Sequence, residues 1–329
     1  MPDYTRYGLT VNPYRTRELD PLCNPHDEAR LAEVDGLSTH KQVIEEALQA
    51  AIAARRAAFF LVAGGSGTGR STVANWIISR YARYLGLAPE RMLVPNRSVV
   101  SNDDFDTLLN WFAFLDNRID DVDDISLGPI VDETLARLVD VARRETMVPT
   151  FAKTARLVNK ALRSQKDSNG KTRPAAYAVC LEGVNVYSIV RAVLDVFEEV
   201  PTVAVFTTFG LENVGKDVVG LFRQTKGDFR QVVQLGPLTA TEVALVLEKR
   251  WRESSQHPDE PPFDRDALVQ TLGRSPRPLG RILVLMSRLI DIKLAEYDGQ
   301  CAWPQNTGLK LTPQQIEQHL VVLEADYGL

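Results

Sequence analysis

The chain has few of the residues that mark secreted, metal-binding or membrane-spanning proteins. Its 329 residues include three cysteines, Cys23, Cys180 and Cys301. They lie far apart, so they indicate neither a disulfide framework nor a zinc site. The four histidines are also scattered. No apolar run is long enough to span a bilayer, and the first residues lack the basic and apolar regions of a signal peptide. We therefore expect a cytoplasmic protein without a membrane span.

An excess of positive charge is missing as well. The sequence has 38 Lys and Arg residues against 43 Asp and Glu residues, which gives a formal net charge of −5. Such a balance gives no general attraction to nucleic acid, although a local basic patch on an oligomer would still allow it. No repeats or extended low-complexity tracts are present. With 44% hydrophobic residues, the chain can bury a sizeable core and is expected to form two domains.

A glycine-rich stretch lies between an apolar run at 59–63 and a helical pattern at 72–78. It reads Gly64, Gly65, Ser66, Gly67, Thr68, Gly69, Arg70, Ser71 and Thr72. The glycines permit backbone dihedrals that bulky residues resist, so successive N–H groups can form an anion-binding nest. The positive end of the following helix adds to that field. Residues 64–72 are therefore predicted to bind phosphate. The alternative is a glycine-rich turn without a ligand, which the flanking strand and helix disfavour.

Arg70 stands where the phosphate-loop motif, Gly-x4-Gly-Lys-Ser/Thr, has lysine. Arginine keeps the charge but replaces a compact ammonium with a wide planar fork. Phosphate binding and catalysis are thus separate questions at this position.

Apolar runs alternate with helical patterns through the first two thirds of the chain. The expected strands are at 59–63, 92–95, 175–181, 203–208 and 231–235. The expected helices between them are at 39–56, 72–85, 102–119, 129–145, 150–165 and 186–199. This order predicts an α/β fold, a three-layer α/β/α parallel sheet covered on both faces.

After Pro237 the pattern is helical only. A helix is expected to begin at Thr239, with Glu242 completing a capping box. Further helices are expected at 263–272, 278–296 and 312–325. The predicted organisation is an N-terminal arm at 1–38, an α/β nucleotide-binding core at 39–236 and a small all-helical domain at 237–329.

Magnesium in a phosphate site takes oxygen ligands, usually a loop hydroxyl and a carboxylate at a neighbouring strand end. Ser71 supplies the hydroxyl, and the strand at 175–181 is followed by Glu182. Nucleotide hydrolases place two acidic residues at that point, one for the metal and one to orient water. Here one acid is missing in either register, so Glu182 can be a metal ligand or a base but not both. The alternative is a solvated glutamate at a strand end.

Taken together, these stretches resemble the AAA+ branch of the P-loop ATPases, and most of all its origin-recognition, secretion-pathway and transposition-regulator groups. The loop at 64–71 and the acidic strand end at 182 carry the resemblance first. The segment 235–242 is similar to the connection between core and lid, and 273–277 is similar to the lid motif Gly-x-x-Pro-Arg. Gly8-Leu9 with Asn12-Pro13-Tyr14 resembles the opening of the secretion-pathway group. The resemblance covers about residues 7 to 325.

Roles for further residues are implied by this resemblance. Thr207 or Thr208 would be the first sensor of the γ-phosphate, where asparagine is common, and Arg277 would be the second sensor. Arg223 or Arg230 would be an arginine finger acting on a neighbouring subunit. The alternative for Arg277 is a solvated arginine at a helix N-terminus, and for the other two arginines an ordinary surface position.

The resemblance implies a protein that binds ATP or ADP with Mg²⁺. The substituted loop lysine, the missing acid of the Walker B pair and the absent sensor asparagine each weaken hydrolysis more than binding. We expect slow or absent turnover and a regulatory or assembly role in a homo- or hetero-oligomer or with a protein partner. One alternative is an active ATPase motor or loader acting on DNA or a protein complex. The other is an interaction scaffold that binds no nucleotide.

Overall fold

The computed structural model describes residues 2–15, 17–31, 35–87, 92–93, 98–99, 176–182, 190, 194, 202–223, 229–273, 276–297, 299 and 301–326. The helices expected at 102–119, 129–145 and 150–165, and most of the one at 186–199, lie outside these residues. The chain divides into two compact units. One contains Thr39–Gly64 and Val73–Gln234, and we call it the sheet unit. The other, the helical unit, contains Met1–Ser38, Gly65–Thr72 and Leu235–Leu329.

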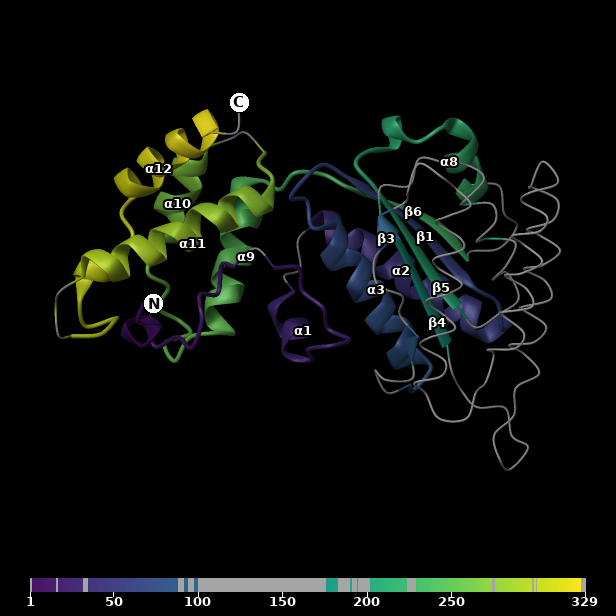
Figure 1. The fold of residues 1–329 in the computed structure, drawn as a ribbon, viewed down its shortest axis with the longest axis horizontal. Helices are drawn as coiled ribbons and strands as arrows, with labels where there is room; N and C mark the ends of the chain where they lie inside the picture. The colour runs from purple at the N-terminus through teal and green to yellow at the C-terminus, as the bar shows by residue number, and fades with distance from the viewer. Residues whose placement is uncertain are drawn as a thin grey trace, which may run out of the picture. The chain divides into compact units, whose positions relative to one another are not determined.

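A parallel sheet forms the centre of the sheet unit, as predicted (Figure 1). Its order is β2 (Met92–Leu93), β4 (Ala176–Glu182), β5 (Thr202–Thr208), β1 (Ala58–Gly64) and β6 (Arg230–Leu235), and β3 (Ser98–Val99) also pairs with β4. The pairs β1–β5, β5–β4, β4–β2 and β4–β3 are parallel. Every residue of β1 and β5 is buried. Strands covered on both faces read as continuous apolar runs, which is why the sequence alone located them.

Helices α2 (Asp35–Ala54) and α3 (Arg70–Tyr84) lie side by side next to the sheet (Figure 1). Buried Trp76 of α3 has the Lys41 ammonium 5.7 Å and the Arg80 guanidinium 5.6 Å from its ring centroid. Arg80 also forms an ion pair with Glu45 at 3.1 Å. The sequence did not predict α8 (Lys216–Arg223), whose Phe222 packs against Phe206 of β5, or the short 3₁₀ turn at Leu211–Asn213.

The helical unit contains α9 (Ala240–Arg252), α10 (Arg265–Leu272), α11 (Leu279–Glu296) and α12 (Pro313–Asp326), each close to its predicted position. Helix α10 contacts both α9 and α12, and α11 contacts the same two helices. The predicted capping box is confirmed at the start of α9: the Glu242 N–H donates to the Thr239 hydroxyl, and the Thr239 N–H donates to the Glu242 carboxylate.

The N-terminal segment contributes side chains between residues 4 and 14 to the hydrophobic core of this unit. Tyr7, Leu9 and Tyr14 are buried in the same cluster as Trp251 and Trp303. The 3₁₀ turns Tyr4–Tyr7 and Thr307–Leu309 are joined by the Tyr7 hydroxyl, which donates to the Leu309 carbonyl at 2.6 Å. The short helix α1 (His26–Arg30) contacts α9. The chain passes between the two compact units at 38/39, 64/65, 72/73 and 234/235, whereas the proposed functional domains at 1–38, 39–236 and 237–329 stay a prediction.

Candidate phosphate-binding site

The glycine-rich loop follows β1 directly and leads into α3, as the sequence predicted. Gly67 and Gly69 have φ angles of +75° and +90°. L-residues with a side chain rarely adopt such angles, so glycine is required at both positions for conformational reasons. The turn is closed by Thr68, whose N–H and hydroxyl both donate to the Gly65 carbonyl, at 3.3 and 2.8 Å. Alternation of left-handed and ordinary backbone is the conformation that makes an anion-binding nest.

The loop also contacts the beginning of α11. The Gly280 N–H donates to the Gly67 carbonyl at 3.0 Å. A Cβ added to Gly280 would lie 3.0 Å from the Gly67 Cα, and one added to Gly67 would lie 3.3 Å from the Pro278 Cβ. Glycine is therefore favoured at both positions because the loop and the start of α11 approach each other so closely. The loop and the first turn of α11 belong to the same compact unit, so they hold one another in place.

Arg277 lies one residue before Pro278 and is held by its backbone in a short antiparallel bridge. Its N–H donates to the Leu238 carbonyl at 2.9 Å, and the Leu238 N–H donates to its carbonyl at 3.2 Å. Its Nε donates to the Leu272 carbonyl at the end of α10, at 3.2 Å. The structure thus brings the backbone at Arg277 next to the loop, while its predicted contact with phosphate stays a prediction.

Arg70, Ser71 and Thr72 form the first turn of α3 and are half-buried. A basic residue followed by two hydroxyl residues at a helix N-terminus places charge, a possible metal ligand and hydrogen-bond donors on one turn. The Thr72 hydroxyl already takes part in a contact that the sequence did not predict, because it accepts a hydrogen bond from the Leu19 N–H at 3.2 Å.

In the sheet unit, the predicted strand-end residues meet at one edge. Glu182 is the last residue of β4 and is aligned with Thr207 of β5, which is aligned in turn with Val62 of β1. Thr207 and Thr208 are both buried, and the Thr208 hydroxyl donates to the Gly210 carbonyl at 3.4 Å. Since parallel strands end at the same edge, Glu182 and Thr207 lie near the point where β1 enters the loop.

The two predicted finger arginines have different surroundings. Arg223 is the last residue of α8 and is exposed. Arg230 begins β6, where its Nη1 donates to the Leu221 carbonyl at 3.0 Å and its guanidinium carbon lies 5.5 Å from the centroid of the Phe59 ring. The more exposed Arg223 is better placed to meet a partner, although a finger role for either residue stays a prediction.

The fold is similar to that of known structures. The ORC2 protein of Aeropyrum pernix, determined as ADPNP and ADP complexes, matches with a TM-score of 0.55 and 10% identity, over 95% of this chain and 72% of that chain. The fold is that of the AAA+ P-loop ATPases. The predicted fold class and the predicted AAA+ resemblance in fold are thereby confirmed.

Two other AAA+ structures are similar at a lower level. The A. pernix ORC1 protein in complex with DNA has a TM-score of 0.47 at 15% identity, over 87% of this chain and 65% of that chain. RuvB of Thermotoga maritima has a TM-score of 0.42 at 15% identity, over 88% of this chain and 71% of that chain. No protein-family model and no curated protein sequence matches the chain.

Two kinds of feature are absent from the described residues. No group of three or more His, Cys, Asp or Glu side chains there is arranged to hold a metal ion. Among the same residues, no helix has both the length and the apolar character that crossing a membrane requires.

Three features of the site were missed from the sequence. Gly280 stands within the first turn of a predicted helix. A glycine inside a helical pattern can indicate that another backbone segment approaches closely, so this contact had a signal in the sequence. The contact between Leu19 and Thr72 and the buried Asp27 behind it have no local signature, because their partners are distant in the chain.

Proposed function

We propose that the chain binds ATP or ADP together with Mg²⁺ through residues 64–72, and that it turns ATP over slowly or not at all. It then acts as a nucleotide-dependent regulatory or assembly subunit. The observation that carries the proposal is the left-handed backbone at Gly67 and Gly69, between the end of β1 and the start of α3. That backbone can point successive N–H groups at an anion, and the helix N-terminus adds a favourable field.

Each residue of the first turn of α3 has a role in this proposal. Arg70 provides the positive charge for the phosphates, Ser71 offers a hydroxyl to Mg²⁺, and Thr72 offers a hydroxyl to a phosphate oxygen. The described residues contain no ready cluster of metal ligands. Magnesium would therefore arrive with the nucleotide phosphates, as Mg²⁺ commonly does, with Glu182 as a second protein ligand.

Weak hydrolysis follows from the residues at the strand ends. Mg²⁺ binding and orientation of the attacking water need separate groups, and Glu182 is the one carboxylate that this part of the sequence offers. At the neighbouring position Thr207 provides a short hydroxyl, and Arg70 provides a fork in place of an ammonium. The backbone cradle for phosphate is complete by comparison. Binding is thus better supported than turnover.

A regulatory protein with weak turnover needs a partner that responds to whether ATP or ADP is bound. Exposed Arg223 at the end of α8 is our candidate for contact with a neighbouring subunit. Arg277, held beside the loop by its backbone, is our candidate for sensing the phosphates from the helical unit.

Titration calorimetry with MgADP and MgATP tests nucleotide binding directly. We expect saturable binding to the purified chain and a loss of affinity of about tenfold or more in Arg70→Ala, because a charge-assisted contact to phosphate is removed. Arg83→Ala, an exposed arginine later on the same helix, is the matched control and should bind as the wild type does. Absence of binding at millimolar nucleotide would leave the interaction scaffold as the better hypothesis.

A phosphate-release assay on the same samples separates the regulatory proposal from the active motor. We expect release below about one turnover per second, the lower end of the usual range of enzyme turnover. Rapid release that is abolished by Glu182→Gln would replace our proposal with the motor or loader. Duplex DNA added to the assay tests one partner class, and genuine binding should weaken steeply as salt rises.

A further inference from the structure

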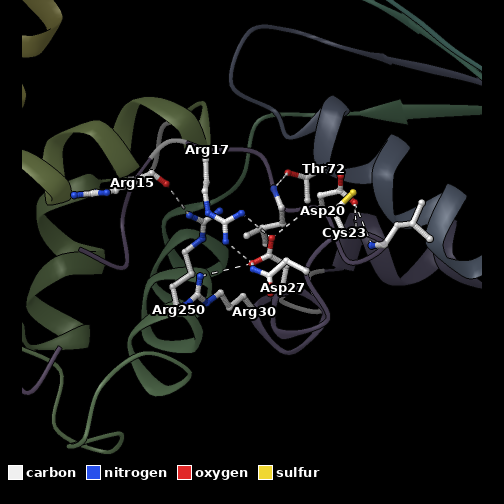
Figure 2. A network of polar contacts seen from close by, with 11 residues as sticks. Arg15, Arg17, Asp20, Cys23, Asp27, Arg30, Thr72 and Arg250 are labelled. Atoms are coloured by element: carbon white, nitrogen blue, oxygen red, sulfur yellow. Dashed lines mark hydrogen bonds and ion pairs between the residues drawn. The ribbon is translucent and has the colours of Figure 1, made fainter. Parts of the chain in front are cut away.

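Asp27 of α1 is a fully buried carboxylate whose acceptors are all filled by its own segment of the chain (Figure 2). Its Oδ2 accepts hydrogen bonds from Arg17 Nη1 at 2.8 Å and from the Asp20 N–H at 3.0 Å. Its Oδ1 accepts from Arg17 Nη2 at 2.6 Å and from Asn24 Nδ2 at 3.1 Å. An ionised carboxylate has about four acceptor positions. Asp27 therefore has no capacity left for a metal ion or a ligand, and its role is to hold the residues around it.

The residues that Asp27 holds lie on both sides of Leu19. Arg17 is tied to Asp27 by its side chain and Asp20 by its backbone N–H. Leu19 between them is 4% exposed, and its N–H donates to the Thr72 hydroxyl in the first turn of α3. The position of this amide is thus fixed from both sides. Figure 2 shows Arg17, Asp20, Asp27 and Thr72 with dashed lines for the contacts.

The hydrogen bond from Leu19 leaves Thr72 able to act on a ligand. A threonine hydroxyl has one proton to donate and two positions at which it can accept. Because the Leu19 N–H occupies one accepting position, it fixes the hydroxyl oxygen and leaves the proton free to point elsewhere. A phosphate oxygen beside the first turn of α3 would receive that proton in a charge-assisted hydrogen bond.

We infer that Arg17 and Asp27 form a clamp that positions the Leu19 amide on Thr72, so that nucleotide affinity depends on two residues remote from the phosphate. This inference rests on the proposed nucleotide binding. Arg17 and Asp27 are positioning residues in it, and Thr72 is the residue that contacts the nucleotide. The N-terminal segment then acts on the first turn of α3, more than 40 residues further along the chain.

The clamp depends on the negative charge of Asp27, because several arginines surround this carboxylate. The guanidinium groups of Arg30 and Arg250 lie close by: Arg30 Nη1 is 3.6 Å from Asp27 Oδ1, and Arg250 Nη1 donates to the Arg15 carbonyl at 3.3 Å. Burial, together with Arg30 and Arg17, lowers the pKa of Arg250 to about 10, and Asp27 opposes that change. Among the described residues, the Nε atoms of Arg30 and Arg250 have no hydrogen-bond partner. Asp27 is therefore the counter-charge on which this group of arginines depends.

Affinity measurements on four proteins test the clamp: wild type, Arg17→Gln, Thr72→Val and the double variant. Arg17 is used because its side chain is 48% exposed and its loss should leave the chain folded. Each single change is expected to raise the Kd for MgADP by between about two- and about tenfold, the usual effect of one hydrogen bond. The double variant should be no weaker than the weaker single variant, because both changes break the same path.

Arg6→Gln is the matched control, since it makes the same substitution elsewhere in the N-terminal segment, and its Kd should equal that of the wild type. Effects of Arg17→Gln and Thr72→Val that multiply in the double variant, or no effect of Arg17→Gln, would overturn the clamp. Failure of the wild type itself to bind would instead overturn the proposed function.

Hydrogen exchange of the Leu19 amide provides a readout that needs no nucleotide. Its protection should fall in Arg17→Gln and in Thr72→Val and return in Thr72→Ser, which keeps the hydroxyl. A role limited to general stability would not distinguish serine from valine at this position. Equal protection in all variants would overturn the clamp.

Discussion

Arg70 is the residue at which binding and hydrolysis separate. Its side chain keeps a positive charge at the start of α3, where a phosphate would lie. Lysine would present that charge as a compact ammonium with donors that can follow the phosphates as charge develops. We therefore predict that Arg70→Lys raises the rate of phosphate release at least about tenfold, with a smaller change in Kd. A steady-state assay at saturating MgATP gives the rate. An unchanged rate would show that Glu182 or Thr207, and not Arg70, limits turnover.

Gly280 is the residue at which α11 approaches the loop most closely. Alanine is a better helix former than glycine by about 1 kcal/mol, so Gly280→Ala should not lower the melting temperature of the free chain much. Its Cβ would nevertheless lie 3.0 Å from the Gly67 Cα and push the loop aside. We predict a Kd for MgADP about tenfold higher, the lower range of an overpacking penalty.

The control for Gly280 is Gly236→Ala in the same unit, where an added Cβ meets nothing within 4 Å. It should bind like the wild type. Equal affinity of Gly280→Ala and the wild type would mean that the loop adjusts to α11 without cost.

At the level of elements, α1 and α9 contact each other at a site where one buried carboxylate is surrounded by several arginines. Asp27 on α1 is fully buried, and Arg250 on α9 is 5% exposed. Removal of one partner from a buried ion pair leaves charge uncompensated, so Asp27→Asn should lower the free energy of unfolding by about 3 kcal/mol. Arg17 and Arg30 remain beside Asp27 when Arg250 is replaced. Arg250→Met should therefore be neutral or stabilise the chain by up to about 2 kcal/mol.

The lowered pKa of Arg250 determines how the stability difference between Arg250→Met and the wild type depends on pH. Because the pKa of Arg250 in the folded chain, about 10, is below the ordinary value of an arginine side chain, the unfolded chain binds this proton more tightly. The cost of the buried charge is thus fully present below about pH 10 and is relieved only as the pH rises beyond it. Urea unfolding between pH 6 and 9 should give the same difference between Arg250→Met and the wild type throughout. A difference that changes within that range would contradict this assignment.

At the level of the whole molecule, the loop belongs to the same compact unit as the N-terminal segment and α9–α12. A nucleotide that binds the loop should therefore stabilise distant parts of that unit. At one hundred times its Kd, a ligand adds about 2.7 kcal/mol to the free energy of unfolding. With MgADP we predict slower hydrogen exchange at residues 17–30 and in the first turn of α11, as well as at 64–72. The Arg70→Ala chain is the control. Slowing confined to 64–72 would show that the loop is not coupled to its unit.

Local patterns were sufficient to predict much of the fold. The strands β1, β4 and β5 were found because they are apolar runs of strand length, and α9 because Thr239 and Glu242 cap it. Short elements without a strong pattern, such as β3, α1 and α8, were missed. Helix α2 begins at Asp35, four residues before the predicted start, because helix boundaries depend on contacts that periodicity does not record.

The sequence by itself determined the loop. Its glycines at 67 and 69 need backbone angles that other residues resist, and that requirement is local. Only the tertiary structure decided what holds the loop: Gly280 against Gly67, and Leu19 against Thr72 with Asp27 behind it. These pairs are separated by many residues in the chain, and each consists of a backbone amide or a buried carboxylate whose partner is chosen by folding. Since every residue but proline carries such an amide, composition and spacing cannot reveal which of them will meet.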